Sequence, residues 1–121
     1  MIPLKQVFEI PAHISAAEFR NRIRGRQITR FPVYEGPRSN VIGILHLLDI
    51  IQSRDTEDVA ASELIKPACK LSEQLSVAEA LFELQEQHQT MVVVVDAGGK
   101  AVGVATVKDL VEEIVGELKV W

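Results

Sequence analysis

The sequence contains an internal duplication, and this feature limits the possible folds more than any other. Residues 42–50 align with residues 102–110, with Gly43 matching Gly103 and Asp49 matching Asp109. Ser15 and Ser76 open two similar stretches that start 61 residues apart. A repeat of this length predicts two copies of one supersecondary unit that pack against each other.

Each copy is expected to be a helix, two strands and a second helix, preceded by an extended lead-in. Residues 15–18 and 76–79 read Ser-x-x-Glu, the capping-box pattern that starts a helix. Strands are expected at 31–34 and 41–45 in the first copy and at 91–95 and 101–105 in the second. Because an isolated hairpin is only marginally stable, we expect the copies to pack face to face about a pseudo-twofold axis. The predicted fold is α+β with small sheets packed by helices, the repeats being 1–58, with the lead-in, and 59–121.

Composition excludes several classes of protein. The hydrophobic fraction of 47% is ample for a core, and a net charge of −4 argues against a general nucleic-acid binder. Cys69 is the single cysteine, so neither a disulfide framework nor a cysteine-rich metal site can form within one chain. The longest apolar run is Met91 to Val95, far short of the ~20 residues that span a bilayer. No signal peptide is visible, and we expect the chain to be soluble.

A hydroxyl and a carboxylate lie at the last strand-to-helix junction. Thr106 ends the expected strand, and Asp109 follows one turn into the expected helix. Helix N-termini attract anions, so Thr106 is a candidate to donate to a phosphate and Asp109 to accept from ribose hydroxyls. The alternative is that Thr106 caps the helix and Asp109 complements its positive end.

Other polar residues suggest weaker sites, each with a structural alternative. Five arginines lie between positions 20 and 30. They could bind a phosphate group or another domain, with Arg30 the best candidate to bind phosphate, or they could be solvated residues that favour the negative end of a helix. Asp109, Glu112, Glu113 and Glu117 form either a Mg²⁺ site or a solvated acidic face. The three histidines lack paired ligand spacing, so we expect no metal site, and no nucleophilic pattern supports catalysis.

The chain resembles a tandem pair of cystathionine-β-synthase (CBS) domains, often called a Bateman module. Within that family, three segments look like the CorC/HlyC group of magnesium and cobalt efflux proteins, a group related to proteins called hemolysins. These segments are Arg30 to Gly36, Val41 to His46 and Glu112 to Glu117. The opening Met1-Ile2-Pro3 resembles the entry of that group into its CBS pair.

This resemblance implies a regulatory module, not an enzyme, that binds ATP or AMP, with or without Mg²⁺ and without a covalent cofactor. The nucleotide motif of the family is kept in the second repeat as Gly103, Thr106 and Asp109. The first repeat keeps Gly43 and Asp49 but has His46 in place of the hydroxyl, so we expect one competent site and one degenerate site. By position in the repeat, Val92, Val93 and Leu71 are candidates for the adenine slot.

The resemblance also implies the context of the module. We expect a homodimer through the CBS pair, a membrane transporter domain as partner, and no nucleic acid. The module would be a soluble fragment at the cytoplasmic face, and the full-length protein an inner-membrane protein. The alternative function is a ligand-free dimerisation or docking domain of the same protein, in which side chains fill the cleft.

Overall fold

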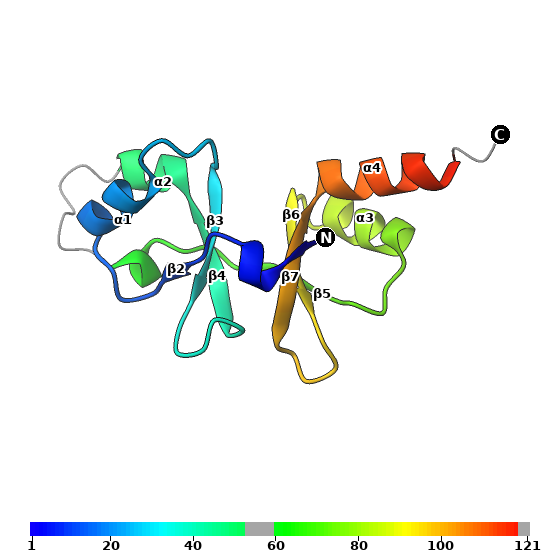
Figure 1. The fold of residues 1–121 in the computed structure, drawn as a ribbon, viewed down its shortest axis with the longest axis horizontal. Coiled ribbons are helices and arrows are strands. Elements are labelled where there is room, and N and C mark those ends of the chain that lie inside the picture. Colours follow the sequence, from blue (N-terminus) through cyan, green and yellow to red (C-terminus); the bar gives the residue numbers. More distant parts are fainter. Residues whose placement is uncertain (53–59, 119–121) are drawn as a thin grey trace. The chain divides into compact units, whose positions relative to one another are not determined.

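The computed structural model describes residues 1–52 and 60–118, which form two compact units. Residues 8–68 form the first, here called the contiguous unit, and residues 1–7 together with 69–121 form the second, the composite unit (Figure 1). The predicted repeat boundary between 58 and 59 lies outside the described residues.

The contiguous unit is a three-stranded sheet covered by helices on one face (Figure 1). Its strand order is β2-β3-β4, with β2 parallel to β3 and β3 antiparallel to β4. Phe19 and Phe31 meet edge to face with ring centroids 5.0 Å apart, and both are fully buried in the core. The elements are β2 (Ile10–Pro11), α1 (Ala16–Ile23), β3 (Arg30–Tyr34), β4 (Val41–His46), α2 (Leu47–Gln52) and a short 3-10 helix, η2 (Ala61–Glu63).

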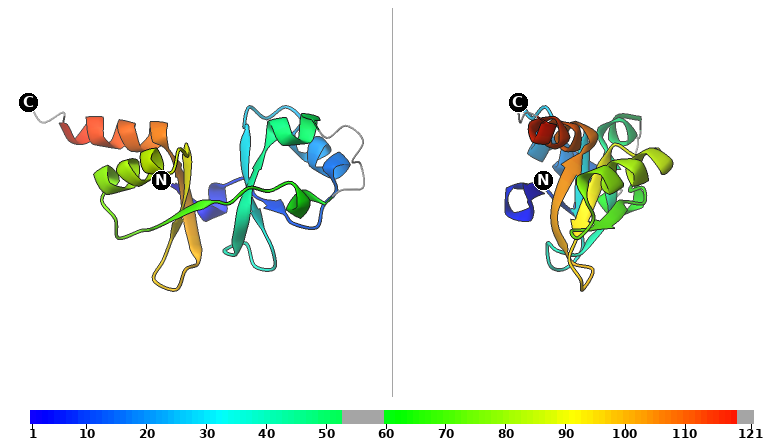
Figure 2. Two further views of the ribbon diagram at one scale, coloured as in Figure 1. Left: turned by 180° about the vertical axis from the view of Figure 1, so that it is seen from behind. Right: turned by 90° about the vertical axis from the view of Figure 1, so that its right-hand side faces the viewer.

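The composite unit repeats this arrangement with one additional strand. Its sheet has the order β1-β7-β6-β5, and two mutually packed helices cover one face of it (Figure 2). Leu84 and Leu110, one from each helix, belong to the buried core of this unit. The elements are β1 (Ile2–Pro3), a 3-10 helix η1 (Leu4–Gln6), β5 (Cys69–Ser72), α3 (Val77–Glu86), β6 (Met91–Val95), β7 (Ala101–Thr106) and α4 (Val107–Leu118).

The duplication is visible in the strand register, which confirms the predicted α+β fold. Phe31 pairs with Leu45 in one hairpin, and Val92 pairs with Ala105 at the equivalent place in the other. Both hairpins also have a register shift at the same position, between Val33 and Tyr34 and between Val94 and Val95. Because β2 and β5 pair in parallel with β3 and β6, the extended lead-in of each repeat becomes a third strand.

Residues 1–7, here called the N-terminal strap, belong to the composite unit although they precede the first repeat in sequence. Ile2 and Pro3 pair antiparallel with Val104 and Gly103. A Cβ at Gly103 would lie 2.5 Å from the Ile2 carbonyl oxygen and 2.8 Å from the Met1 sulfur, so only glycine permits this approach. The contiguous unit has the same feature, since a Cβ at Gly43 would lie 2.8 Å from the Lys66 carbonyl oxygen.

The predicted helix caps form completely in one repeat and partly in the other. The Ser76 hydroxyl accepts from the Glu79 N–H at 3.1 Å, and Glu79 accepts in return from the Ser76 N–H at 3.4 Å. Ser15 caps α1 in the same way, at 3.1 Å from the Glu18 N–H. The Glu18 carboxylate pairs instead with Arg22, so half of the predicted box is absent.

Candidate functional site

Thr106 and Asp109 face each other at the start of α4. The Asp109 N–H donates to Thr106 Oγ1 at 3.2 Å, and the Thr106 N–H donates to Asp109 Oδ2 at 3.0 Å. This is a reciprocal cap of the helix, because each side chain binds a backbone N–H that the helix leaves without a partner. The alternative prediction, that Thr106 caps the helix and Asp109 complements its positive end, agrees with these two hydrogen bonds.

The cap leaves part of both side chains available. Thr106 uses its hydroxyl as an acceptor, so its O–H proton is not consumed. Asp109 uses Oδ2 as the acceptor, and its Oδ1 has no hydrogen-bond partner within the described part of the chain. Both side chains are half-buried. The pair thus offers one donor and one anionic acceptor next to a helix N-terminus.

The equivalent position in the first repeat has different chemistry. His46 Nδ1 accepts from the Leu48 N–H at 3.4 Å and so replaces the hydroxyl as the cap of α2. Asp49 Oδ2 lies 3.6 Å from Lys66 Nζ and, among the described residues, has no hydrogen-bond partner. The carboxylate that corresponds to Asp109 thus forms an ion pair with the ammonium of Lys66.

Lys66 was not predicted as a site residue, although the sequence contains a signal for it. The backbone of Lys66 lies against Gly43, just as the backbone of Ile2 lies against Gly103. The sequence shows the same correspondence, because both residues are followed by proline, as Lys66-Pro67 and Ile2-Pro3. An ammonium therefore stands in one repeat where the other has an aliphatic side chain. This difference explains why Asp49 is ion-paired while Asp109 has no ion pair among the described residues.

The other predicted nucleotide-binding residues lie on different faces of the composite sheet or belong to the contiguous unit. Val92 and Leu71 line a cavity on the helix side of the composite sheet, whereas Val93 pairs with Val104 on the opposite face. Gly103 lies beneath the N-terminal strap. Arg30 belongs to the contiguous unit, where it pairs in register with His46.

The remaining charged groups do not converge on one centre. Arg22 binds Glu18 at 2.8 Å, and the Arg26 guanidinium lies 4.0 Å from the centre of the Phe8 ring. Lys108 approaches Glu112 at 3.9 Å on the acidic face of α4. Within residues 1–52 and 60–118, no group of three or more His, Cys, Asp or Glu side chains could hold a metal ion.

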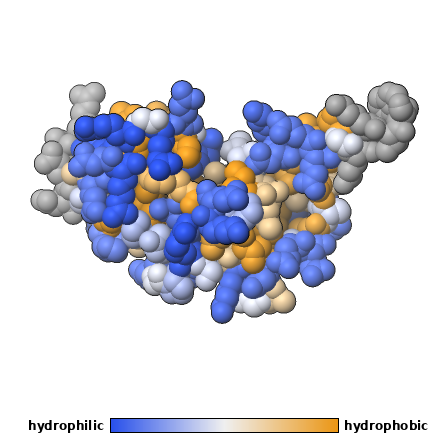
Figure 3. All heavy atoms as spheres, in the orientation of Figure 1, coloured by the Kyte–Doolittle hydropathy of each residue, from blue (hydrophilic) through white to orange (hydrophobic). Residues whose placement is uncertain are grey.

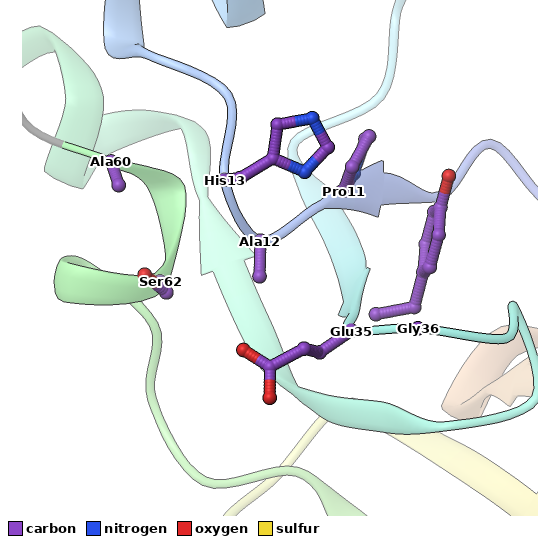
Figure 4. A pocket seen from close by; sticks show the side chains of 8 residues that line it. Pro11, Ala12, His13, Glu35, Gly36, Ala60 and Ser62 are labelled. Carbon is purple, nitrogen blue, oxygen red and sulfur yellow. The ribbon is translucent and has the colours of Figure 1, made fainter.

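A pocket of about 700 Å³ lies in the contiguous unit and was not predicted from the sequence. His13, Tyr34, Glu35 and Ser62 provide its polar side chains. The imidazole of His13 and the carboxylate of Glu35 point away from each other (Figure 4). These groups therefore do not form a coordinated binding site.

Cys69 is buried in the core of the composite unit. Burial raises the pKa of its thiol, and the charge of Glu83 raises it further. The thiol therefore stays protonated at neutral pH and is a poor nucleophile. None of the described helices has the length and hydropathy needed to cross a bilayer.

Comparison with known sequences identifies a family. The family model described as CBS domain matches residues 1–55 and 58–116. The chain is 29% identical over 123 residues to UPF0053 protein YhdP of Bacillus subtilis, covering 98% of this chain and 28% of that protein. It is 30% identical over 121 residues to the magnesium and cobalt efflux protein CorC of Pasteurella multocida, covering 98% of this chain and 40% of CorC. The chain thus spans less than half the length of these two relatives.

Comparison with solved structures gives the same fold. One similar structure is the CBS domain of the bacterial CNNM/CorC family Mg²⁺ transporter in complex with ATP, with a TM-score of 0.87 and 24% identity over 96% of this chain and 84% of that one. Another is a CBS-domain pair with bound AMP from Klebsiella pneumoniae, with a TM-score of 0.80 and 20% identity over 96% and 94%.

Proposed function

The chain belongs to the CBS-domain family as a tandem pair, and from this premise we propose that it is a regulatory module that binds ATP or AMP at the start of α4. The observation that carries the proposal is the arrangement of Thr106 and Asp109, which keeps a hydroxyl proton and Oδ1 available after capping the helix. The ATP-bound and AMP-bound structures of similar fold support the choice of an adenine nucleotide.

The two side chains suit different parts of a nucleotide. The Thr106 hydroxyl and the N-terminal end of α4 favour a phosphate, because the helix end carries partial positive charge. Asp109 Oδ1 accepts from the ribose hydroxyls. A hydrogen bond to a charged group contributes about 1.5–3 kcal/mol, a substantial part of the roughly −8 kcal/mol of micromolar binding.

The base requires an apolar surface, and the candidates lie on two faces of the composite sheet, with Val93, which is completely buried, on one and Val92 and Leu71 on the other. Val92 and Leu71 line a cavity whose rim carries the carboxylates of Glu73 and Glu113. A nucleotide bears several negative charges, so we assign its base to the side of Val93. Gly103 supports this site indirectly, because its missing side chain lets the N-terminal strap lie against β7.

The first repeat is proposed to lack a competent site. His46 caps α2 with a ring nitrogen, where Thr106 caps α4 with a hydroxyl. The carboxylate of Asp49 is already paired with Lys66. We therefore propose one nucleotide per chain.

We further propose that the module controls a divalent-cation transporter of the CorC type, to which it is joined in a longer chain. The similarity to the magnesium and cobalt efflux protein CorC supports this context. In it, the module would lie on the cytoplasmic face of a membrane protein, act as a homodimer and bind its nucleotide with or without Mg²⁺. The nucleotide would act by binding one arrangement of the module more tightly than another.

Calorimetric titration with ATP and AMP, with and without Mg²⁺, tests the proposal. Asp109→Asn keeps an oxygen to cap α4 but removes the charge, so we expect an affinity about tenfold lower. The matched control is Asp49→Asn in the first repeat, which should leave the affinity and a stoichiometry of one unchanged. Absence of heat from either nucleotide at tens of micromolar protein would contradict the proposal.

A second candidate function is a ligand-free dimerisation or docking domain. It is favoured by the capping bonds, which account for Thr106 and Asp109 without a ligand, and by the exposed apolar residues Val111 and Val115 on α4. In that case molecular mass would depend on protein concentration, and nucleotide would cause no thermal shift.

A further inference from the structure

The composite unit contains an apolar cavity that the proposed nucleotide site does not use. It has a volume of about 220 Å³ and lies among α3, α4 and the sheet. Its inner wall is formed by Val92, Ala105 and Leu110, which belong to the buried core of the unit. Neither Thr106 nor Asp109 lines it.

The cavity arises from smaller side chains at core positions that are filled in the other repeat. Val92 and Ala105 occupy the places of Phe31 and Leu45, which are paired in the same way and are completely buried. Ala80, four residues after Ser76, corresponds to Phe19, four residues after Ser15. Since protein cores are normally packed without large voids, the composite unit has space that its repeat partner lacks.

The mouth of the cavity is acidic. Glu73 and Glu113 line it, both are exposed, and neither forms an ion pair within residues 1–52 and 60–118. The lining includes no lysine, arginine or histidine. Met1, which is 55% exposed, completes the wall, and apolar side chains reach the surface of this unit (Figure 3).

These features define one class of ligand. An apolar interior accepts an aromatic or aliphatic body, and carboxylates at the mouth favour a cation over a neutral or anionic group. We propose that this cavity binds small organic amines, with the ammonium group held at Glu73 and Glu113 and the apolar body against Val92, Ala105 and Leu110. The site is separate from the proposed nucleotide site and does not depend on it.

Three probes with similar bodies and different charges test the ligand class. We would titrate 2-phenylethylamine, 2-phenylethanol and phenylacetate into ¹⁵N-labelled protein and follow the amide signals of Val92, Ala105 and Leu110. The amine should bind roughly two- to fivefold more tightly than the alcohol, as expected for an exposed ion pair, and phenylacetate should bind least. Equal affinity for all three, or no shift of these signals, would overturn the proposal.

Variants locate the site. Ala105→Leu copies Leu45 and should abolish binding by filling the cavity, and Ala80→Phe, which copies Phe19, serves if the first variant fails to fold. Glu113→Gln should reduce the affinity for the amine to that for the alcohol, whereas Glu112→Gln on the same helix should have no effect. Unchanged amine binding in a folded cavity-filling variant would overturn the proposal. Asp109→Asn should leave amine binding intact, so this result is independent of whether ATP binds.

Discussion

Glu9 is the acidic side chain that departs most from its usual surroundings among the described residues. Its side chain has no exposed surface, and Oε1 accepts from Arg38 Nε at 2.8 Å. Its Oε2 has no hydrogen-bond partner within the described part of the chain. Burial raises the pKa of this carboxyl, and the hydrogen bond and charge of Arg38 oppose the rise without cancelling it.

The raised pKa of Glu9 predicts how stability depends on pH. Because the folded chain holds the proton more tightly than the unfolded chain, the stabilisation is complete below the unfolded pKa, near 4.5, and is lost as pH rises through the folded pKa. Glu9→Gln removes this titration and can still accept from Arg38. We expect the free energy of unfolding of the variant to fall less than that of the wild type between pH 4 and pH 7.

Urea denaturation at several pH values measures this difference. Glu35→Gln, at an exposed position of the same unit, is the control and should follow the wild type. A steeper fall in the Glu9→Gln variant would contradict the assignment.

Among the secondary-structure elements, the first helix of each repeat is followed by a residue in the left-handed conformation, and this residue differs between the repeats. Gly25 follows α1 with φ +82°, and His88 follows α3 with φ +54°. Around His88, the Gln89 N–H donates to the Leu84 carbonyl at 2.9 Å and the His88 N–H to that of Gln85 at 3.2 Å. This is a Schellman motif, whose left-handed residue is most favourable as glycine.

Substituting these two residues separately should change the free energy of unfolding in opposite directions. His88→Gly removes the strain of a left-handed non-glycine residue and should raise the free energy of unfolding by about 0.5–1 kcal/mol. Gly25→Ala should lower it by about 1 kcal/mol through backbone strain alone, since no atom lies within 4 Å of the added Cβ. Thermal or urea denaturation measures both, and a loss of stability in His88→Gly would contradict this account.

The sequence predicts some elements well because their signals are local. Both hairpins follow from alternating apolar runs, and the caps at Ser15 and Ser76 from their spacing to a glutamate. β2 and β5 were missed as strands because strands of two and four residues in parallel pairing are too short to show a hydrophobic pattern in the sequence.

The approach of Thr106 to Asp109 was predictable from their spacing within one helical turn. The separation of Val93 from Val92 and Leu71 follows from strand alternation, which determines the face that each side chain occupies.

In the molecule as a whole, the N-terminal strap pairs residues from the first repeat of the sequence with a strand of the second repeat. β1 pairs with β7, about one hundred residues away, and the chain passes between units at Val7 and again at Ala68. No local sequence pattern predicts such a pairing. Gly103 and Gly43 do mark the position in each sheet where the backbone of another segment packs closely against the strand. Neither unit therefore corresponds to one repeat of the sequence.

Deleting residues 1–7 should destabilise the composite unit selectively. It removes the pairing at the edge of β7 and the Met1 wall of the cavity, and should lower the free energy of unfolding of this unit by roughly 2 kcal/mol, as for a few lost hydrogen bonds. Hydrogen exchange measured by mass spectrometry should show faster exchange in β6 and β7, with β3 and β4 unchanged. Equal acceleration in both units would contradict the division of the chain described here.

The strap also sets the order in which the newly made chain can mature. The contiguous unit has all of its residues once position 68 has left the ribosome, whereas Ile2 and Pro3 need a partner strand at 101–106. At about 5–20 residues per second, the strap, made about one hundred residues before β7, waits roughly 5–20 s for its partner strand. During translation, the strap is thus made well before the strand that it pairs with, and any partner that captures it early competes with the native sheet.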